Sequence, residues 1–295
     1  MSPYNLALSG GYHAFMLAAY HVHTCFCDGK ESPDSMADAA FAAGYRILGF
    51  SAHAPVPLMS QGNLAPESVT PYIHAVRAAA DRYRDRMEIL AGLEIEWVPD
   101  LGVPPAEGYD WASVDFRIGA VHFTKAPSGM LFTVDCPVAE FERGMLTGYT
   151  GDGIRLFQDY YRSVAELVHS GGFEILGHLD LVKMHNRGGR WFDESSPGYK
   201  AAWLEAVDSL TGTGIVAEVN TGGLARGKAL EPYPSLAILR ELRARKVPIV
   251  IGADAHQGRH LNPRWRMLGT ELARAAGYRE LAVLSRDGWS SGPLE

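Results

Sequence analysis

Short apolar and β-branched runs alternate along the chain with longer segments of helical pattern. Strands are expected at Met16–Tyr20, Arg46–Phe50, Met87–Leu93, Phe116–Val121, Phe173–Leu176, Gly214–Val219 and Val247–Ile251. Helices are expected from Ser32 onwards and at Pro66–Arg84, Asp152–Ser170, Pro197–Leu210 and Ser235–Arg245. Repeated alternation of this kind predicts a parallel sheet with helices between its strands.

Residues typical of helix ends support these helices. Pro33 stands at an early helical position and Asp34 in the first turn, where both are favoured. Gly44, Gly171 and Gly212 each follow a helical stretch, which is where a helix C-terminus commonly places glycine.

The seven strands, with helices between most of them, favour an α/β barrel of a single domain. A doubly wound open sheet would produce a similar string, so closure of the barrel is an inference. Residues 16–295 are assigned to the barrel. Residues 1–15 are unlike the rest and are interpreted as a disordered N-terminal extension or an early start assignment, because Met16 stands just before the first strand.

Composition narrows the function classes. Of the 295 residues, 47% are hydrophobic and 21% charged, which excludes a disordered chain. The formal net charge of -7 argues against nucleic acid as a partner, and no apolar run reaches the ~18 residues typical of a membrane span. Three cysteines and the lack of a secretory signal pattern predict a reducing, cytoplasmic location.

Polar residues follow six of the seven predicted strands at the point where each strand ends. They are six histidines and two acids, namely His21, His23, His53, Glu94, His122, His178, Asp254 and His256. In a barrel the C-terminal ends of all strands meet on the face that carries the active site. A single histidine there would usually be a hydrogen-bonded structural residue. Packing alone gives no reason for this repetition, because clustered imidazoles repel when charged and lose solvation when neutral.

A bound cation would offset both the repulsion between charged imidazoles and the lost solvation of neutral ones. His21 and His23 lie two apart on a strand, so both can face one ion, and Asp254 and His256 have the same spacing. Imidazole and carboxylate together suit Zn, Fe or Mn. With about four to five ligands per ion, the donor count predicts two or three divalent metal ions.

Asp28 is a further candidate ligand in the loop after the first strand, with a turn aspartate before glycine as its alternative interpretation. Cys25 and Cys27 are better interpreted as loop thiols. Four other histidines are assigned to no site: His13, His74, His169 and His260, the last expected at the surface.

Metal ions at a barrel mouth bind anions and can activate water for attack on a phosphate ester. The sequence contains no Gly-x-Ser-x-Gly nucleophile motif and no phosphate-binding P-loop. Lys183, Asn186 and Arg226 lie in loops on the predicted active face and are the candidate substrate-binding residues. A solvated surface cation is the alternative interpretation for Lys183 and Arg226.

Several motifs in this order resemble the PHP (polymerase and histidinol phosphatase) superfamily. They are His21-x-His23, His53, Glu94, His122, Gly177-His178 and Asp254-x-His256. The runs Phe26–Lys30, Gly49–Pro55, Gly177–Lys183 and Glu218–Gly223 are similar to the histidinol-phosphatase branch, and the resemblance covers roughly residues 17–270.

The resemblance implies a distorted, TIM-like (βα)7 barrel with a trinuclear site. His21, His23, Glu94 and Asp254 would hold one ion, Glu94 would bridge to a second held by His122 and His178, and Asp28, His53 and His256 would hold the third. The implied reaction is hydrolysis of L-histidinol phosphate, a small-molecule ester, by a metal-bound hydroxide. Glu94, Asp254 and Arg226 are therefore the candidate catalytic residues.

Two residues depart from the family pattern. Family members often carry an acid where Ala19 stands and Asp, Ser or Gly where Ala52 stands. Neither position is an expected ligand, but loss of a supporting acid can weaken metal affinity by ~10–100-fold.

Two other functions compete with the phosphomonoesterase. One is a PHP-type phosphodiesterase or exonuclease acting on nucleotides or nucleic acid, and the other is a metal-binding module without turnover. The sequence fixes neither the oligomeric state nor the residues that recognise the rest of the substrate.

Overall fold

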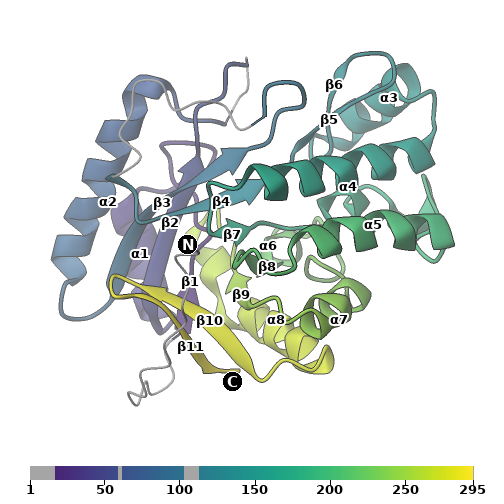
Figure 1. The fold of residues 1–295 in the computed structure, drawn as a ribbon. Coiled ribbons are helices and arrows are strands. Elements are labelled where there is room, and N and C mark those ends of the chain that lie inside the picture. Colours follow the sequence, from purple (N-terminus) through teal and green to yellow (C-terminus); the bar gives the residue numbers. More distant parts are fainter. Residues whose placement is uncertain (1–16, 59–61, 103–112, 295) are drawn as a thin grey trace.

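Seven parallel strands form the centre of the molecule (Figure 1). The computed structural model describes residues 17–58, 62–102 and 113–294, so the predicted extension at 1–15 lies outside the described residues. The strands are β1 (Leu17–Ala19), β2 (Tyr45–His53), β3 (Glu88–Glu96), β4 (Phe116–Ala120), β7 (Ile175–Leu176), β8 (Val216–Asn220) and β9 (Ile249–Gly252). They are hydrogen-bonded in that order, so each predicted strand is confirmed.

The first and last strands close the sheet into a nearly complete barrel. Just beyond β1 and β9, Val22 and Ala255 form a parallel bridge. The His23 amide donates to the Ala255 carbonyl at 2.8 Å, and the Ala255 amide donates to the His21 carbonyl at 3.1 Å. This contact between the two sheet edges favours the barrel over the doubly wound alternative.

The helices between the strands begin and end close to where the sequence predicts. They are α1 (Pro33–Ala42), a 3-10 turn (Pro66–Ser68) with α2 (Val69–Tyr83), α4 (Gly153–Ser170), α5 (Pro197–Ser209) and α7 (Leu236–Ala244). The side chains of Ser32, Asp152 and Ser196 accept the amide hydrogens that open α1, α4 and α5. Gly171 follows α4 with a positive φ of 64°, a conformation that glycine adopts without strain.

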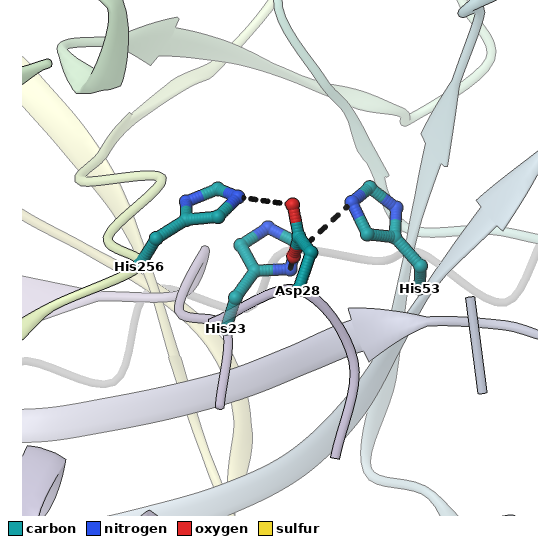
Figure 2. A group of neighbouring side chains, drawn as sticks. All are labelled: His23, Asp28, His53 and His256. Carbon is teal, nitrogen blue, oxygen red and sulfur yellow. Dashed lines mark hydrogen bonds and ion pairs between the residues drawn. The ribbon is translucent and has the colours of Figure 1, made fainter. Parts of the chain in front are cut away.

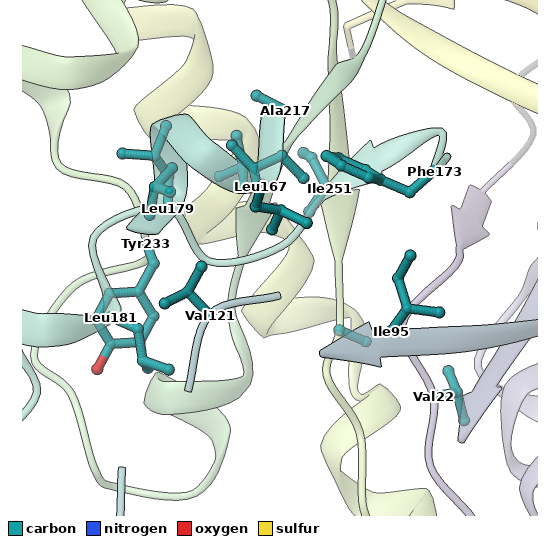
Figure 3. Packing of buried hydrophobic residues seen from close by; sticks show 14 of the residues in the cluster. Val22, Ile95, Val121, Leu167, Phe173, Leu179, Leu181, Ala217, Tyr233 and Ile251 are labelled. Atoms are coloured by element: carbon teal, nitrogen blue, oxygen red, sulfur yellow. The ribbon is translucent and has the colours of Figure 1, made fainter. Parts of the chain in front are cut away.

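The hydrophobic core has an outer and an inner part. Figure 3 shows part of the outer core, where Leu167 of α4 and Phe173 pack against Ala217 of β8 and Ile251 of β9. The inner part fills the interior of the barrel with Tyr20, Leu90, Phe116, Ile118, Val250 and their neighbours. A Cβ at Gly92 would lie 2.5 Å from the Phe116 ring, so this position has room only for glycine.

Several elements were not expected from the sequence. They are the hairpin of β5 (Phe123–Lys125) and β6 (Leu131–Thr133), α3 (Val138–Gly148), α6 (Gly222–Ala225), α8 (Pro263–Ala275) and the hairpin of β10 (Glu280–Ser285) and β11 (Gly288–Pro293). The C-terminal hairpin packs Leu284 and Trp289 against the inner core. No helix in the described part of the chain combines the length and apolarity needed to cross a bilayer.

The Tyr20→Phe variant tests how the C-terminal hairpin is attached. The buried Tyr20 hydroxyl donates to the Leu284 carbonyl (3.0 Å) and accepts from the Leu284 amide (2.8 Å). Its removal leaves both backbone groups unpaired, so urea titration is expected to show a loss of about 2 kcal/mol in the free energy of unfolding. Tyr278→Phe removes a hydroxyl with only one backbone partner, Val247, and should cost less. Equal stability of the Tyr20 variant and the parent would contradict this attachment.

Candidate metal centre

The candidate ligands gather at one rim because each follows or ends a strand of the barrel. His21 and His23 lie just after β1, and His53 ends β2. Glu94 lies near the end of β3. His122 follows β4, His178 follows β7, and Asp254 and His256 follow β9. Most are buried; His53 and His256 are half-buried. The predicted convergence of these residues is therefore present in the folded chain.

Glu94 lies at the centre of the group and is only 2% exposed. Its carboxylate oxygens approach five imidazoles, at 3.2 Å for His21, 3.4 Å for His23, 3.0 Å for His53, 3.7 Å for His122 and 3.1 Å for His178. One carboxylate surrounded by five rings from four other strand ends is the arrangement expected of a residue shared between ions.

Asp28 forms a second focus on the more exposed side of the site (Figure 2). Its oxygens lie 2.8 Å from His256 Nε2, 3.5 Å from His23 Nδ1 and 3.8 Å from His53 Nε2. The side chain points into the site between the three rings, so the turn interpretation and the ligand interpretation are compatible here.

The chemistry of these donors fits divalent cations. Among the side-chain atoms of the candidate ligands, five are buried without a hydrogen-bond partner: His21 Nε2, His23 Nε2, Asp28 Oδ1, Glu94 Oε2 and His178 Nδ1. Buried polar atoms are normally satisfied, so a cluster of unsatisfied nitrogen and oxygen acceptors calls for a cation.

Three groups in the described part of the chain have ligand atoms within 4.8 Å of one another. They are His21, His23 and Glu94; His53, Glu94 and His122; and His23, Asp28, His53 and His256. They differ from the expected assignment in that His23 and His53 each belong to two groups, whereas His178 and Asp254 belong to none. His178 Nε2 lies 3.1 Å from Glu94 Oε1, and Asp254 Oδ1 lies 3.6 Å from His23 Nε2.

Glu218 is a residue of the site that sequence reasoning missed. It is 1% exposed and accepts from His21 Nδ1 at 2.7 Å, from the His178 amide at 3.0 Å and from the Asn220 side chain at 2.9 Å. By holding Nδ1 of His21, it leaves Nε2 of the ring as the metal-binding atom. A Cβ at position 252 would lie 1.7 Å from Glu218 Oε1, so Gly252 makes the space that this carboxylate occupies.

Glu96 plays the same part for His122. Its carboxylate lies 2.6 Å from His122 Nδ1 and also accepts the His122 amide at 2.9 Å. Both acids could have been found from the alternation of side chains along a strand, because residues two apart point to the same face. Glu96 stands two residues after Glu94, and Glu218 stands two residues before Asn220.

Charge pairing keeps the central carboxylates ionised. Burial opposes ionisation of Glu94, but His53, His21 and His178 hold its pKa well below the usual range. Burial likewise opposes ionisation of Asp254, and Arg226 with His21 and His256 lowers its pKa. Both acids are therefore anionic at neutral pH, which is the form that binds metal.

Arg226 reaches the same rim from the end of α6. Its guanidinium makes two bonds to the Asp254 carboxylate, at 3.0 and 2.7 Å, and lies 2.8 Å from His256 Nδ1. Its Nε is buried without a partner. The candidate phosphate-binding cation thus lies directly against the candidate ligands.

Lys183 and Asn186 have partners that the sequence did not predict. Lys183 is buried between Asp180 at 2.9 Å and Glu231 at 2.6 Å. Burial alone would lower the pKa of Lys183, but these two carboxylates raise it.

Asn186 bonds to the backbone of Trp191 and Phe192 and to Glu194, so its amide organises its own loop. The proposed substrate contacts of Lys183 and Asn186 remain predictions.

The remaining histidines and cysteines lie outside the donor groups. His74 is exposed. His260 is buried, contrary to expectation, and its Nδ1 accepts the His256 amide at 3.3 Å, so it supports a candidate ligand. His185, to which the sequence gave no role, donates to the Cys136 carbonyl. Cys27 Sγ lies 3.6 Å from His23 Nδ1, and burial raises the pKa of its thiol.

Comparisons with known proteins agree on one family. The sequence model of the PHP domain matches residues 19–222. A probable histidinol-phosphatase of Deinococcus radiodurans is 33% identical over 245 residues, covering 80% of this chain and 85% of that protein. The histidinol-phosphatase of Bacillus subtilis is 27% identical over 253 residues, covering 80% and 92%.

Solved structures share the fold. A putative histidinol phosphatase from Listeria monocytogenes superposes with a TM-score of 0.75 at 16% identity, covering 85% of this chain and 99% of that one. Histidinol phosphate phosphatase from Lactococcus lactis, in complex with zinc, L-histidinol and phosphate, gives 0.63 at 21% identity, covering 92% and 98%. The predicted seven-stranded barrel is thereby confirmed.

Proposed function

The chain belongs to the PHP domain family, and on this basis we propose that it is a metal-dependent phosphomonoesterase that hydrolyses L-histidinol phosphate to L-histidinol and phosphate. The observation that carries the proposal is the convergence of five imidazoles on Glu94, with Arg226 beside them. A relative with the same activity in its name is 33% identical over most of the chain.

We propose two or three divalent ions, Zn, Fe or Mn, held by the nine predicted ligands. These are His21, His23, Asp28, His53, Glu94, His122, His178, Asp254 and His256. When bound, such ions supply positive charge for phosphate oxygens and activate water at neutral pH. Glu94 would serve more than one ion, because its two oxygens face different rings.

The chain's own residues would orient the phosphate. The Arg226 guanidinium is a planar donor suited to phosphate oxygens, and its pairing with Asp254 fixes its position at the rim. Asp254, anionic and adjacent, would accept a proton from the attacking water. Lys183 would act on the substrate only if it exchanged one of its carboxylate partners.

Phosphate release from L-histidinol phosphate, together with elemental analysis of the purified protein, tests the proposal. We expect turnover of this ester and bound transition metal. Preferential release from nucleotides would favour the phosphodiesterase alternative. A metal-loaded preparation inert towards all phosphate esters tested would favour the non-catalytic module.

Removal of metal by a chelator is expected to abolish phosphatase activity and to lower the thermal midpoint by about 10 °C. Ions at 1,000 times their Kd contribute about 4 kcal/mol to stability, and each kcal/mol moves the midpoint of a chain of this size by roughly 2–4 °C. Calorimetry before and after chelation measures the change. Zn²⁺ or Mn²⁺ should restore both properties, whereas Ca²⁺, which prefers all-oxygen sites, should not. An unchanged midpoint and rate would contradict a metal requirement.

A further inference from the structure

The proposed substrate carries a second charged group close to its phosphate. In L-histidinol phosphate the ammonium group is on the carbon next to the one that bears the phosphate ester. A group that binds this cation must therefore lie near the metal-binding rim. None of the residues assigned so far would bind it, since the rim acids are paired with imidazoles or with Arg226.

Asp135 lies at this place in the fold. It follows β6, between two residues whose backbone is tied to the site. The Val134 amide donates to the carbonyl of His122 at 2.9 Å, and the Cys136 carbonyl accepts from His185 Nε2 at 2.9 Å. Asp135 is thus held between a candidate metal ligand on one side and His185 on the other.

The Asp135 carboxylate is half-buried and has no hydrogen bond or ion pair with any residue of the described chain. By contrast, Asp28, Glu94, Glu96, Glu218 and Asp254 are all paired. Burial opposes the charged forms of His122 and Arg226, and the negative charge of Asp135 helps to raise their pKa values. Burial lowers the pKa of His185, and Asp135 acts against this lowering. These residues belong to three different segments around the mouth, so the carboxylate lies within electrostatic range of all three.

We propose that Asp135 binds the ammonium group of the substrate and so selects amine-bearing phosphate monoesters. An unpaired acid close to Arg226 repels a simple phosphate ester, whereas a substrate with its own cation converts this repulsion into a charge-assisted hydrogen bond. His185 is a positioning residue, because its bond to Cys136 fixes the segment that carries the acid. This inference rests on the proposed function and assigns the recognition of a part of the substrate that the phosphate site leaves free.

The Asp135→Asn variant tests the proposal with two substrates. These are L-histidinol phosphate and imidazolylpropyl phosphate, the analogue without the amino group. We expect kcat/KM for L-histidinol phosphate to fall by about 10- to 100-fold, mainly through KM, as for loss of a hydrogen bond to a charged group. The analogue should be hydrolysed as well as before or better, and metal content should not change. Glu140→Gln, which removes an exposed charge from α3 in the same segment, should leave both substrates unaffected.

Binding of the products without turnover provides an independent measurement. Calorimetric titration should show that the parent binds L-histidinol more tightly than imidazolylpropanol and that Asp135→Asn loses this preference. Equal affinities in the parent, or a preference that survives in the variant, would overturn the role of Asp135. Equal losses on both phosphate esters would also overturn it, since they indicate a structural effect. A parent that prefers L-histidinol but does not hydrolyse its phosphate would refute the proposed function alone.

Discussion

The Glu94→Gln variant is expected to lose most of its bound metal, and its phosphatase rate should fall by about 10³-fold or more. Glu94 is the carboxylate on which five imidazoles converge, so it supplies the central negative charge that would neutralise cations at the rim. An amide of the same shape keeps one oxygen but cannot serve two ions as an anion. Stabilisation of the transferring phosphate by metal is worth several kcal/mol, which sets the scale of the loss. Elemental analysis and phosphate release measure the two effects.

A matched control is available on the same strand. Glu88 begins β3 at the opposite end of the barrel, so Glu88→Gln makes the same chemical change far from the rim. It should retain metal and full activity. Full activity in Glu94→Gln would remove the central role assigned to this residue.

The Glu218→Gln variant should bind metal 10- to 100-fold more weakly, the usual cost of losing a carboxylate that orients a ligating histidine. Glu218 accepts three hydrogen bonds, including that of His21 Nδ1, and an amide cannot accept all of them without turning its own NH₂ group towards a donor. Activity measured against metal concentration should therefore shift to higher concentrations and recover at saturation. This recovery distinguishes it from Glu94→Gln, where added metal should restore little.

Glu205→Gln, on the exposed face of α5, is the control for this substitution. It should give the same metal dependence as the parent. If Glu218→Gln also shows the parent's metal dependence, the His21–Glu218 contact has no part in holding the site.

The strands and most of the rim were predictable because both follow from short-range regularities. Apolar runs of strand length define β1 to β4 and β7 to β9, and parallel strands in a barrel bring their C-terminal ends together whatever lies between them. Histidines placed at those ends, such as His53 and His178, must then meet. Asp28 is the exception among the candidates, since only the folded loop shows that it points at His256.

Partners across the barrel could not be predicted in the same way. Lys183 was predicted from its loop position. Asp180, three residues earlier, is a local partner, but Glu231 pairs with Lys183 only because the chain returns from a distant segment. Glu218 looked like an ordinary strand residue, although it is buried beneath His21. The C-terminal hairpin escaped prediction because β11, Gly288–Pro293, has the glycine, serine and proline of a loop. Its pairing with β10 and its packing under Tyr20 make it a strand.

The closure between β1 and β9 has a consequence for how the protein is made. The ribosome releases His21 and His23 long before their neighbours Asp254 and His256, which lie far along the chain from them. The bridge between Val22 and Ala255 can form only after the later residues have emerged. Until these residues have been made, the first imidazoles of the rim lack their partners, and the same bridge that joins the two sheet edges also joins the two halves of the rim.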